Sequence, residues 1–144
     1  MYRLSRKRSA PLLLLISMLA GAYVFATAQA ALLVPDGTVK LVYFFEEDDK
    51  FVVSDIRSGA FVELRRQANE KLIDKAVANQ VVILVTNRRY VAYSAQTQTW
   101  HEFKRRAKEG FVRVEAADFS AFLVTTDRLI SFNGLTGTWS EHRR

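Results

Sequence analysis

Short apolar runs and alternating segments, separated by turn residues, follow one another along most of the chain. Residues 81–85 form a continuous β-branched apolar run, which is typical of a strand buried on both faces. Residues 90–93 and 99–103 read as the two strands that follow it. Residues 72–77 and 111–116 predict a further strand before this group and before the next one. The pattern therefore predicts an all-β fold of short antiparallel strands.

These groups of strands repeat along the chain with an offset of 39 residues and without a gap. Equivalent positions carry similar residues: 50–53, 89–92 and 128–131; Phe61, Trp100 and Trp139; Glu63, Glu102 and Glu141. A fixed period of this length indicates tandem structural units. We expect three four-stranded units, at about residues 33–66, 72–105 and 111–144. The first unit has Pro35 and Gly37 where its first strand should lie, so we expect that strand to be weak.

The end of the last unit carries a short turn motif. Residues 136–139, Thr-Gly-Thr-Trp, follow the apolar strand at 129–132. This resembles the blade ending of kelch-like and quinoprotein-like β-propellers, and the chain is similar to uncharacterised exported bacterial proteins with such tandem repeats. The resemblance covers residues 72–144 well and 40–66 loosely. The double glycine of kelch repeats and the acidic cofactor motif of quinoproteins are absent, so it implies a fold and no activity.

Three units leave several architectures open. Propellers typically use four to eight blades, so three blades alone do not close a ring. The chain is expected to form a partial propeller, or a homodimer that completes a six-bladed ring. The alternative is a β-trefoil, a fold that needs three four-stranded repeats. The doubly apolar strand at 81–85 favours stacked blades, whereas the count of three favours the trefoil.

The first thirty residues read as a targeting segment. A basic start is followed by an apolar run and by Ala28 and Ala30 at the positions that signal peptidases require, which predicts a signal peptide cleaved after Ala30. The apolar stretch continues to Val34, so about 24 residues are long enough to cross a bilayer. The alternative is an uncleaved inner-membrane anchor through residues 10–34. Both readings predict an exported protein, periplasmic or secreted, with residues 31–144 as a single β-repeat domain.

Composition narrows the function classes. The chain of 144 residues has no cysteine and two histidines, which excludes disulfides, thiolate zinc sites and cysteine nucleophiles. The net charge of +6 falls to +2 once residues 1–30 are removed, because 17 basic residues then face 15 acidic ones. Bulk charge therefore gives little support to nucleic acid as a partner.

Motifs for catalysis are missing. The chain has no nucleophile elbow, no zinc-protease helix motif and no glycine-rich phosphate loop. His101 and His142 occupy different repeat positions, and we expect both to be exposed strand residues. The acidic run at 46–49 lacks the ligand spacing of a calcium loop and is interpreted as a solvated hairpin turn. The sequence thus predicts a protein that is not an enzyme and uses no metal or cofactor.

Basic residues recur at one edge of the predicted units. Antiparallel strands bring the turn after the second strand and the end of the fourth strand to the same edge. The residues expected there are Arg65, Arg66, Arg88, Arg89, Arg105, Arg106 and Arg128. They predict an anion-binding edge for an acidic glycan, a lipid headgroup or an acidic protein patch. The alternative is a set of solvated strand ends that discourages edge-to-edge pairing.

The recurring aromatic position also has two readings. Phe61, Trp100 and Trp139 hold equivalent places, and a side chain that repeats with the fold is expected to pack in its core. The alternative is a trefoil-type carbohydrate-binding protein in which Trp100 and Trp139 stack on sugar rings. The recurring Glu63, Glu102 and Glu141 are expected to pair with neighbouring arginines rather than to catalyse.

Overall fold

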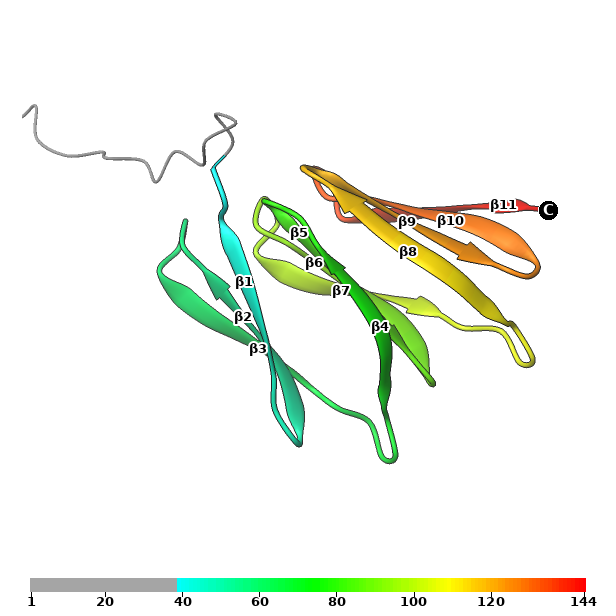
Figure 1. Cartoon of the computed structure of the whole chain (residues 1–144). Coiled ribbons are helices and arrows are strands. Elements are labelled where there is room, and N and C mark those ends of the chain that lie inside the picture. Colours follow the sequence, from blue (N-terminus) through cyan, green and yellow to red (C-terminus); the bar gives the residue numbers. More distant parts are fainter. Residues whose placement is uncertain (1–38) are drawn as a thin grey trace, which may run out of the picture. The chain divides into compact units, whose positions relative to one another are not determined.

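A computed structural model describes residues 39–144, which form eleven strands in three antiparallel sheets (Figure 1). The first sheet holds β1 (Val42–Glu46), β2 (Lys50–Asp55) and β3 (Ala60–Arg65); the second holds β4 (Leu72–Val77), β5 (Val81–Thr86), β6 (Arg89–Ser94) and β7 (Thr99–Lys104); the third holds β8 (Phe111–Ala117), β9 (Ser120–Thr125), β10 (Arg128–Asn133) and β11 (Thr138–Arg143). The predicted all-β class is confirmed. The predicted signal peptide or anchor, and the weak strand near Pro35, lie outside the described residues.

Each sheet is a meander in which strands that follow one another in the chain lie side by side. The repeat in sequence is also a repeat in pairing register: Val52 pairs with Glu63, Val91 with Glu102 and Ile130 with Glu141. The first strands of the second and third sheets both carry a register irregularity, just after Leu72 and just after Phe111. The 39-residue period therefore specifies backbone hydrogen bonds as well as residue types.

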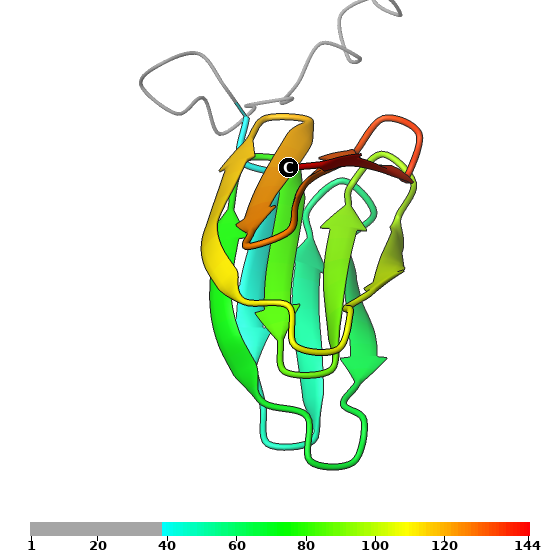
Figure 2. The ribbon, with the colours of Figure 1, turned by 90° about the vertical axis from the view of Figure 1, so that its right-hand side faces the viewer.

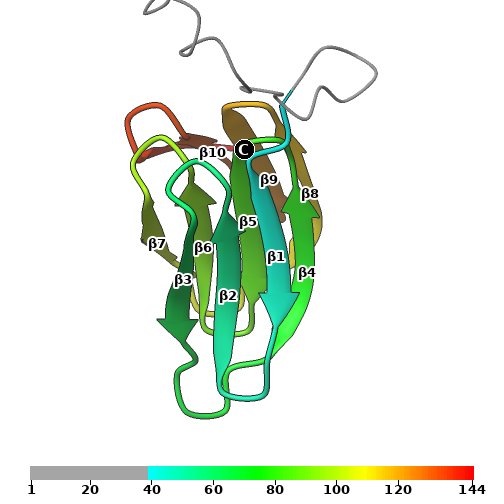
Figure 3. The same cartoon turned by 90° about the vertical axis from the view of Figure 1, so that its left-hand side faces the viewer.

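The second sheet is packed between the other two, and Figures 2 and 3 look onto the third and the first sheet. Along β5 the side chains alternate: Val82 and Leu84 join the apolar cluster with the first sheet, and Ile83 and Val85 join the cluster with the third. All six residues of β5 are buried. The prediction that this strand is covered on both faces is confirmed, and the alternation of a strand explains how one run serves two cores.

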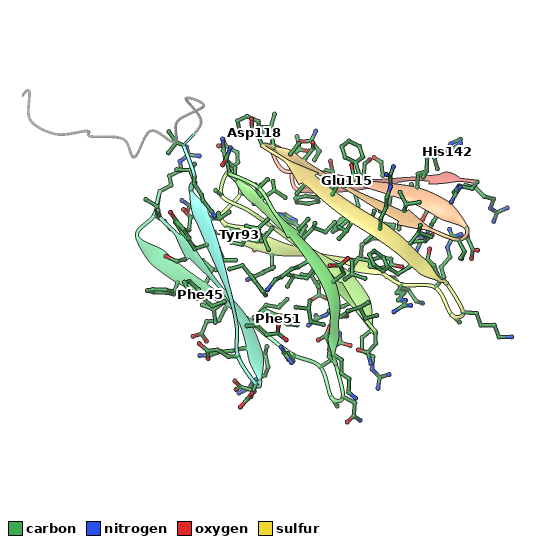
Figure 4. The ribbon with its side chains drawn as sticks, in the orientation of Figure 1. Phe45, Phe51, Tyr93, Glu115, Asp118 and His142 are labelled. Atoms are coloured by element: carbon green, nitrogen blue, oxygen red, sulfur yellow. The ribbon has the colours of Figure 1, made fainter. Side chains whose placement is uncertain are left out.

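Polar contacts also connect successive sheets. The Tyr93 hydroxyl donates to Oδ2 of the buried Asp55 at 2.6 Å, in the space between the first two sheets (Figure 4). Asn79 donates to Asp118 at 2.7 Å, across a separation of 39 residues. These bonds satisfy groups at the sheet ends and hold successive sheets in register.

The expectation that all three recurring aromatic residues pack in the core is wrong for one of them. Trp100 and Trp139 are half-buried against the two apolar clusters. Phe61 is 69% exposed, because it lies on the face of the first sheet that points away from the second. The position is the same in all three units, and only the presence of a preceding sheet decides whether it is covered.

Candidate functional site

Two equivalent hollows lie at one end of the sheets, where the turn after the second strand of a unit meets the segment that leaves its last strand. The basic hollow is lined by Ile73, Asn87, Arg88, Lys104, Arg105, Arg106, Ala107, Lys108 and Glu109. The mixed hollow is lined by Asp48, Asp49, Arg65, Arg66, Gln67, Ala68, Asn69 and Glu70. Every residue of the mixed hollow has its counterpart 39 positions later in the basic hollow. The structure therefore presents one site twice, with different side chains.

The loop that shapes each hollow has the same backbone in both copies. In the basic hollow the Glu109 amide donates to the Arg106 carbonyl at 3.2 Å, and the Arg106 amide donates to the Glu109 carboxylate at 3.1 Å. Lys108 adopts a φ of 64°, a left-handed conformation that is uncommon for lysine. The glutamate thus closes its own loop and fixes where the basic side chains begin.

A buried ion cluster anchors this loop to the neighbouring strands. The Glu109 carboxylate accepts from Arg128 Nε at 2.6 Å and Nη2 at 2.9 Å, and from Thr125 Oγ1 at 2.9 Å. The Tyr90 hydroxyl of the second sheet donates to the same carboxylate at 3.0 Å. All four residues are buried. The cluster joins the loop to β9 and β10 of the third sheet and to β6 of the second.

The environment of this carboxylate keeps it ionised. Burial by itself would raise the pKa of Glu109, but hydrogen bonds from Arg128, the Arg106 amide, Thr125 and Tyr90 lower that pKa to about 2. Burial and the adjacent Glu109 charge raise the pKa of the Tyr90 hydroxyl above its ordinary value. The carboxylate is therefore a fixed negative charge, fully engaged by internal donors and turned away from the hollow.

The mixed hollow has the same arginine and threonine around its glutamate, but Phe51 stands where the other anchor has Tyr90. Arg89 Nε and Nη2 donate to the Glu70 carboxylate at 2.9 and 3.0 Å, and the Thr86 hydroxyl donates to it at 2.9 Å. The second acidic partner of each arginine comes from the last strand of its sheet: Glu102 for Arg89 and Glu141 for Arg128. The prediction that these two recurring glutamates pair with arginines is confirmed. In the first sheet Glu63 pairs with Lys50 instead, at 2.7 Å.

Five of the seven arginines proposed for the anion-binding edge have internal partners. Arg89 and Arg128 are 7% and 3% exposed and belong to the ion clusters just described. Arg105 donates to the carbonyls of Thr86 and Glu109, each at 2.9 Å. Arg66 pairs with Glu46, and Arg106 pairs with Glu141 at 2.6 Å. The repeat carried a partial signal: Arg89 recurs as Lys50 and Arg128, whereas the exposed Arg88 corresponds to Asp49 and Asp127.

The remaining basic side chains gather at the basic hollow. Arg88, Lys104 and Lys108 are exposed and form no ion pair or side-chain hydrogen bond with the rest of residues 39–144. Arg65 is also exposed, but it lines the mixed hollow beside Asp48 and Asp49. The predicted continuous basic edge is thus uneven: the acidic turn neutralises one copy of the site, and positive charge remains at the other.

Glu70 and Glu109 are the site residues that the sequence analysis missed. Their 39-residue spacing was readable, but neither lies in a strand, and only the folded loop brings each beside an arginine 19 residues later. One of the two histidines also differs from expectation. His101 is half-buried against Phe132, with 5.5 Å between ring centroids, and burial lowers its pKa. His142 is exposed, as expected.

Residues 39–144 contain neither a metal-ligand cluster nor a membrane-spanning helix. That part of the chain holds no group of three or more carboxylate, histidine or cysteine residues placed to bind a metal ion. It also holds no helix long and apolar enough to cross a membrane. In the acidic turn at 46–49, the Glu47 carboxylate lies 3.5 Å from Lys50 Nζ, and Glu46 pairs with Arg66. Two of the four carboxylates therefore form ion pairs within the first sheet and the segment that follows it.

Comparison with known proteins assigns no family. No family model matches the chain, and no curated protein matches it. A solved structure, the N-terminal domain of Nup159, is similar over 72% of this chain and 30% of that one, with 12% identity and a TM-score of 0.36. The chain thus spans less than a third of that protein's length. A likeness of this size supports no argument about fold or activity, so function must be reasoned from the site.

Proposed function

We propose that the protein is a non-enzymatic binding module of propeller-like blades that holds an anionic partner at the basic hollow. The observation that carries the proposal is the charge contrast between two copies of one site. The basic hollow is lined by five basic residues and one acidic residue that turns inward. The mixed hollow has Asp48 and Asp49 at the places of Asn87 and Arg88.

The favoured ligand chemistry is an oxyanion. Arg88, Lys104 and Lys108 crowd like charges around an open concave surface, and these charges repel one another unless an anion lies between them. Phosphate, sulfate and carboxylate groups accept several charge-assisted hydrogen bonds from such donors. The loop is already closed by Glu109, so little conformational entropy is lost when an anion binds.

Two further parts of the proposal concern architecture and source of the anion. Three separate meanders stacked face to face support propeller-like blades more than a trefoil, whose repeats share one barrel. The signal-like N-terminal residues support export, and an exported protein meets acidic glycans and phosphorylated lipid headgroups. Both sources carry the same oxyanion chemistry, and an acidic protein patch is the alternative that the experiment separates from them.

The decisive experiment exchanges the residues of one hollow for those of the other. The variant Arg88→Asp with Lys108→Asn installs the side chains of Asp49 and Asn69. The control Arg57→Gln with Arg113→Asp changes the net charge equally but lies outside both hollows. Binding is measured to a sulfated glycan, to vesicles containing phosphorylated headgroups and to a polyglutamate peptide, at two salt concentrations.

We expect the hollow variant to lose about tenfold or more in affinity for one oxyanion source, since two charge-assisted contacts disappear. The control should change the affinity by less than about twofold. Equal losses in both variants would show that bulk charge, not the hollow, attracts the anion. Binding to polyglutamate alone would reassign the partner to an acidic protein, and no binding to any probe would reject the proposal.

A further inference from the structure

The stack of sheets ends in two outer faces that carry exposed apolar side chains. On the first sheet these are Tyr43, Phe45 and Phe61. On the third sheet they are Phe122 and Leu129, beside a shallow depression that His142 also lines. Figure 4 labels Phe45 and His142 on opposite sides of the stack. Patches of exposed aromatic and aliphatic groups on a protein surface commonly mark an interface.

The repeat shows which internal contact each outer face resembles. The exposed residues of the first sheet are equivalent to residues that make both observed sheet–sheet contacts: Tyr43 to Val82 and Ala121, Phe45 to Leu84 and Leu123, Phe61 to Trp100 and Trp139. The outer residues of the third sheet are likewise equivalent to residues that the second sheet turns toward the third: Phe122 to Ile83, Leu129 to Tyr90, His142 to Phe103. The outer faces are therefore the two complementary halves of a contact that the chain already makes twice.

We infer that a second copy of the chain docks on these faces, with the first sheet of each copy packed on the third sheet of the other. The contact is heterologous, and two copies close it on themselves by forming it twice, which gives a ring of six sheets. We choose a second copy as the partner because the two outer faces continue the sheet-to-sheet contact that already occurs twice within the chain. The inference does not depend on the anion-binding proposal, because the outer faces and the hollows share no exposed apolar residue.

Specific pairs across this contact follow from the internal ones. Trp139 stacks on Phe103 with 5.3 Å between ring centroids. The equivalent pair between copies is Phe61 on His142, two rings exposed in the single chain. Phe61, which is exposed in the single chain, is covered in this pair because the second copy supplies the sheet that it lacks.

A charged pair is expected at the opposite end of the same contact. Between the second and third sheets, Asn79 and Asp118 meet at 2.7 Å and hold the same repeat position. The residue at that position in the first sheet is Lys40. Across the copies the pair is therefore Asp118 with Lys40, which have opposite charges. Charge complementarity at the rim specifies register and partner more than it adds affinity.

The polarity of the third sheet's outer face fits a contact that forms between folded chains. Ser120, Ser131 and Ser140 stand where the second sheet has Val81, Ala92 and His101. An interface between separately folded subunits has an apolar centre, and the area around that centre is about as polar as the rest of the protein surface. The apolar centre, made by Phe122 and Leu129, is retained.

Cysteine cross-linking tests the arrangement directly, because the natural chain contains no cysteine. The full chain carrying Phe61→Cys and His142→Cys should form covalent dimers with a short bismaleimide reagent, with two cross-links in each dimer, because facing sheets lie about 10 Å apart, which is too far for a direct disulfide. Each single variant should give at most a small fraction of that product. The two positions lie on opposite outer faces of one chain, so a cross-link within a chain is not expected. A ladder of longer species would overturn the two-copy ring.

A charge swap provides a second, independent measurement by light scattering. The unmodified chain should have the mass of two copies at micromolar concentration. Lys40→Asp and Asp118→Lys should each weaken the dimer about tenfold, and the combined variant should restore most of the affinity. A monomer at all concentrations, or a dimer untouched by both single variants and by Phe61→Glu, would overturn the inference and leave the faces to another segment or partner.

Discussion

The basic and mixed hollows have the same loop backbone and the same buried glutamate, arginine and threonine, yet they present different surfaces. Each is closed by a glutamate, an arginine and a threonine in identical arrangement: Glu70, Arg89 and Thr86 in one, Glu109, Arg128 and Thr125 in the other. The exposed lining differs, because Asp49 and Asn69 of the mixed hollow occupy the positions that Arg88 and Lys108 occupy in the basic hollow.

This comparison separates two kinds of charged residue. The buried glutamate and arginine of the anchor are the same in both hollows, because replacing either partner leaves the other desolvated without compensation. Charges on the lining vary, because water solvates whichever side chain is present. A residue that repeats is therefore structural first, and function is better sought where the repeats disagree.

The largest effect should follow from removal of the anchoring arginines. Arg128→Met should lower the free energy of unfolding by about 3–5 kcal/mol, because it leaves Glu109 charged and buried. Arg89→Met should cost a similar amount through Glu70. Denaturant titration measures both, with Arg113→Met on the exposed surface as a control. A large loss at only one of the two sites would break the equivalence of the hollows.

The next effect is on acid stability. The pKa of Glu109 is lowered to about 2 in the folded chain, so its contribution is complete above the ordinary carboxyl pKa and disappears as pH falls toward 2. Linkage makes this worth on the order of 3 kcal/mol, and the lowered pKa of Glu70 acts in the same direction. Unfolding free energy should decline from about pH 5 downward. In Glu109→Gln that decline should be distinctly shallower, and an unchanged slope would contradict the assignment.

Removal of the threonine hydroxyls should cost less. Thr125→Val keeps the shape but removes one of the donors to the Glu109 carboxylate and the side-chain acceptor of the Arg128 amide, so we expect a loss of about 1–3 kcal/mol. Thr86→Val should lose a comparable amount at the mixed hollow. Thermal unfolding monitored by circular dichroism measures the pair. Losses that differ by more than the experimental error would sharpen the comparison by showing that one loop is held more firmly.

The smallest effect concerns the left-handed loop residue. Asparagine tolerates this conformation better than lysine, so Lys108→Asn should stabilise the chain by about 0.5–1 kcal/mol. The reverse exchange, Asn69→Lys, should destabilise it by a similar amount. Both variants are compared with Lys104→Asn, which removes the same charge from an exposed position in a strand. Stabilisation by both lysine replacements would attribute the effect to charge repulsion instead.

Much of the fold could be predicted from periodicity. The run at 81–85 predicted a doubly covered strand because its consecutive residues are all apolar and a strand turns them to opposite faces, and β5 is buried along its whole length. The site could be predicted only in part. Antiparallel geometry placed Arg88 and Arg105 at the same edge, but that geometry alone could not tell exposed Arg88 from buried Arg89. That difference depends on the direction in which each side chain points and on the loop that brings the Glu70 carboxylate beside Arg89.

The sequence by itself determined the strands, their 39-residue period and the edge at which basic residues collect, because these depend on local pattern and chain spacing. Only the tertiary structure decided which charges are buried, which aromatic ring is covered and which hollow stays positive. Burial depends on neighbours far apart in the chain: Phe61 and Trp100 share a repeat position, and they differ in exposure because only Trp100 has a preceding sheet to pack against.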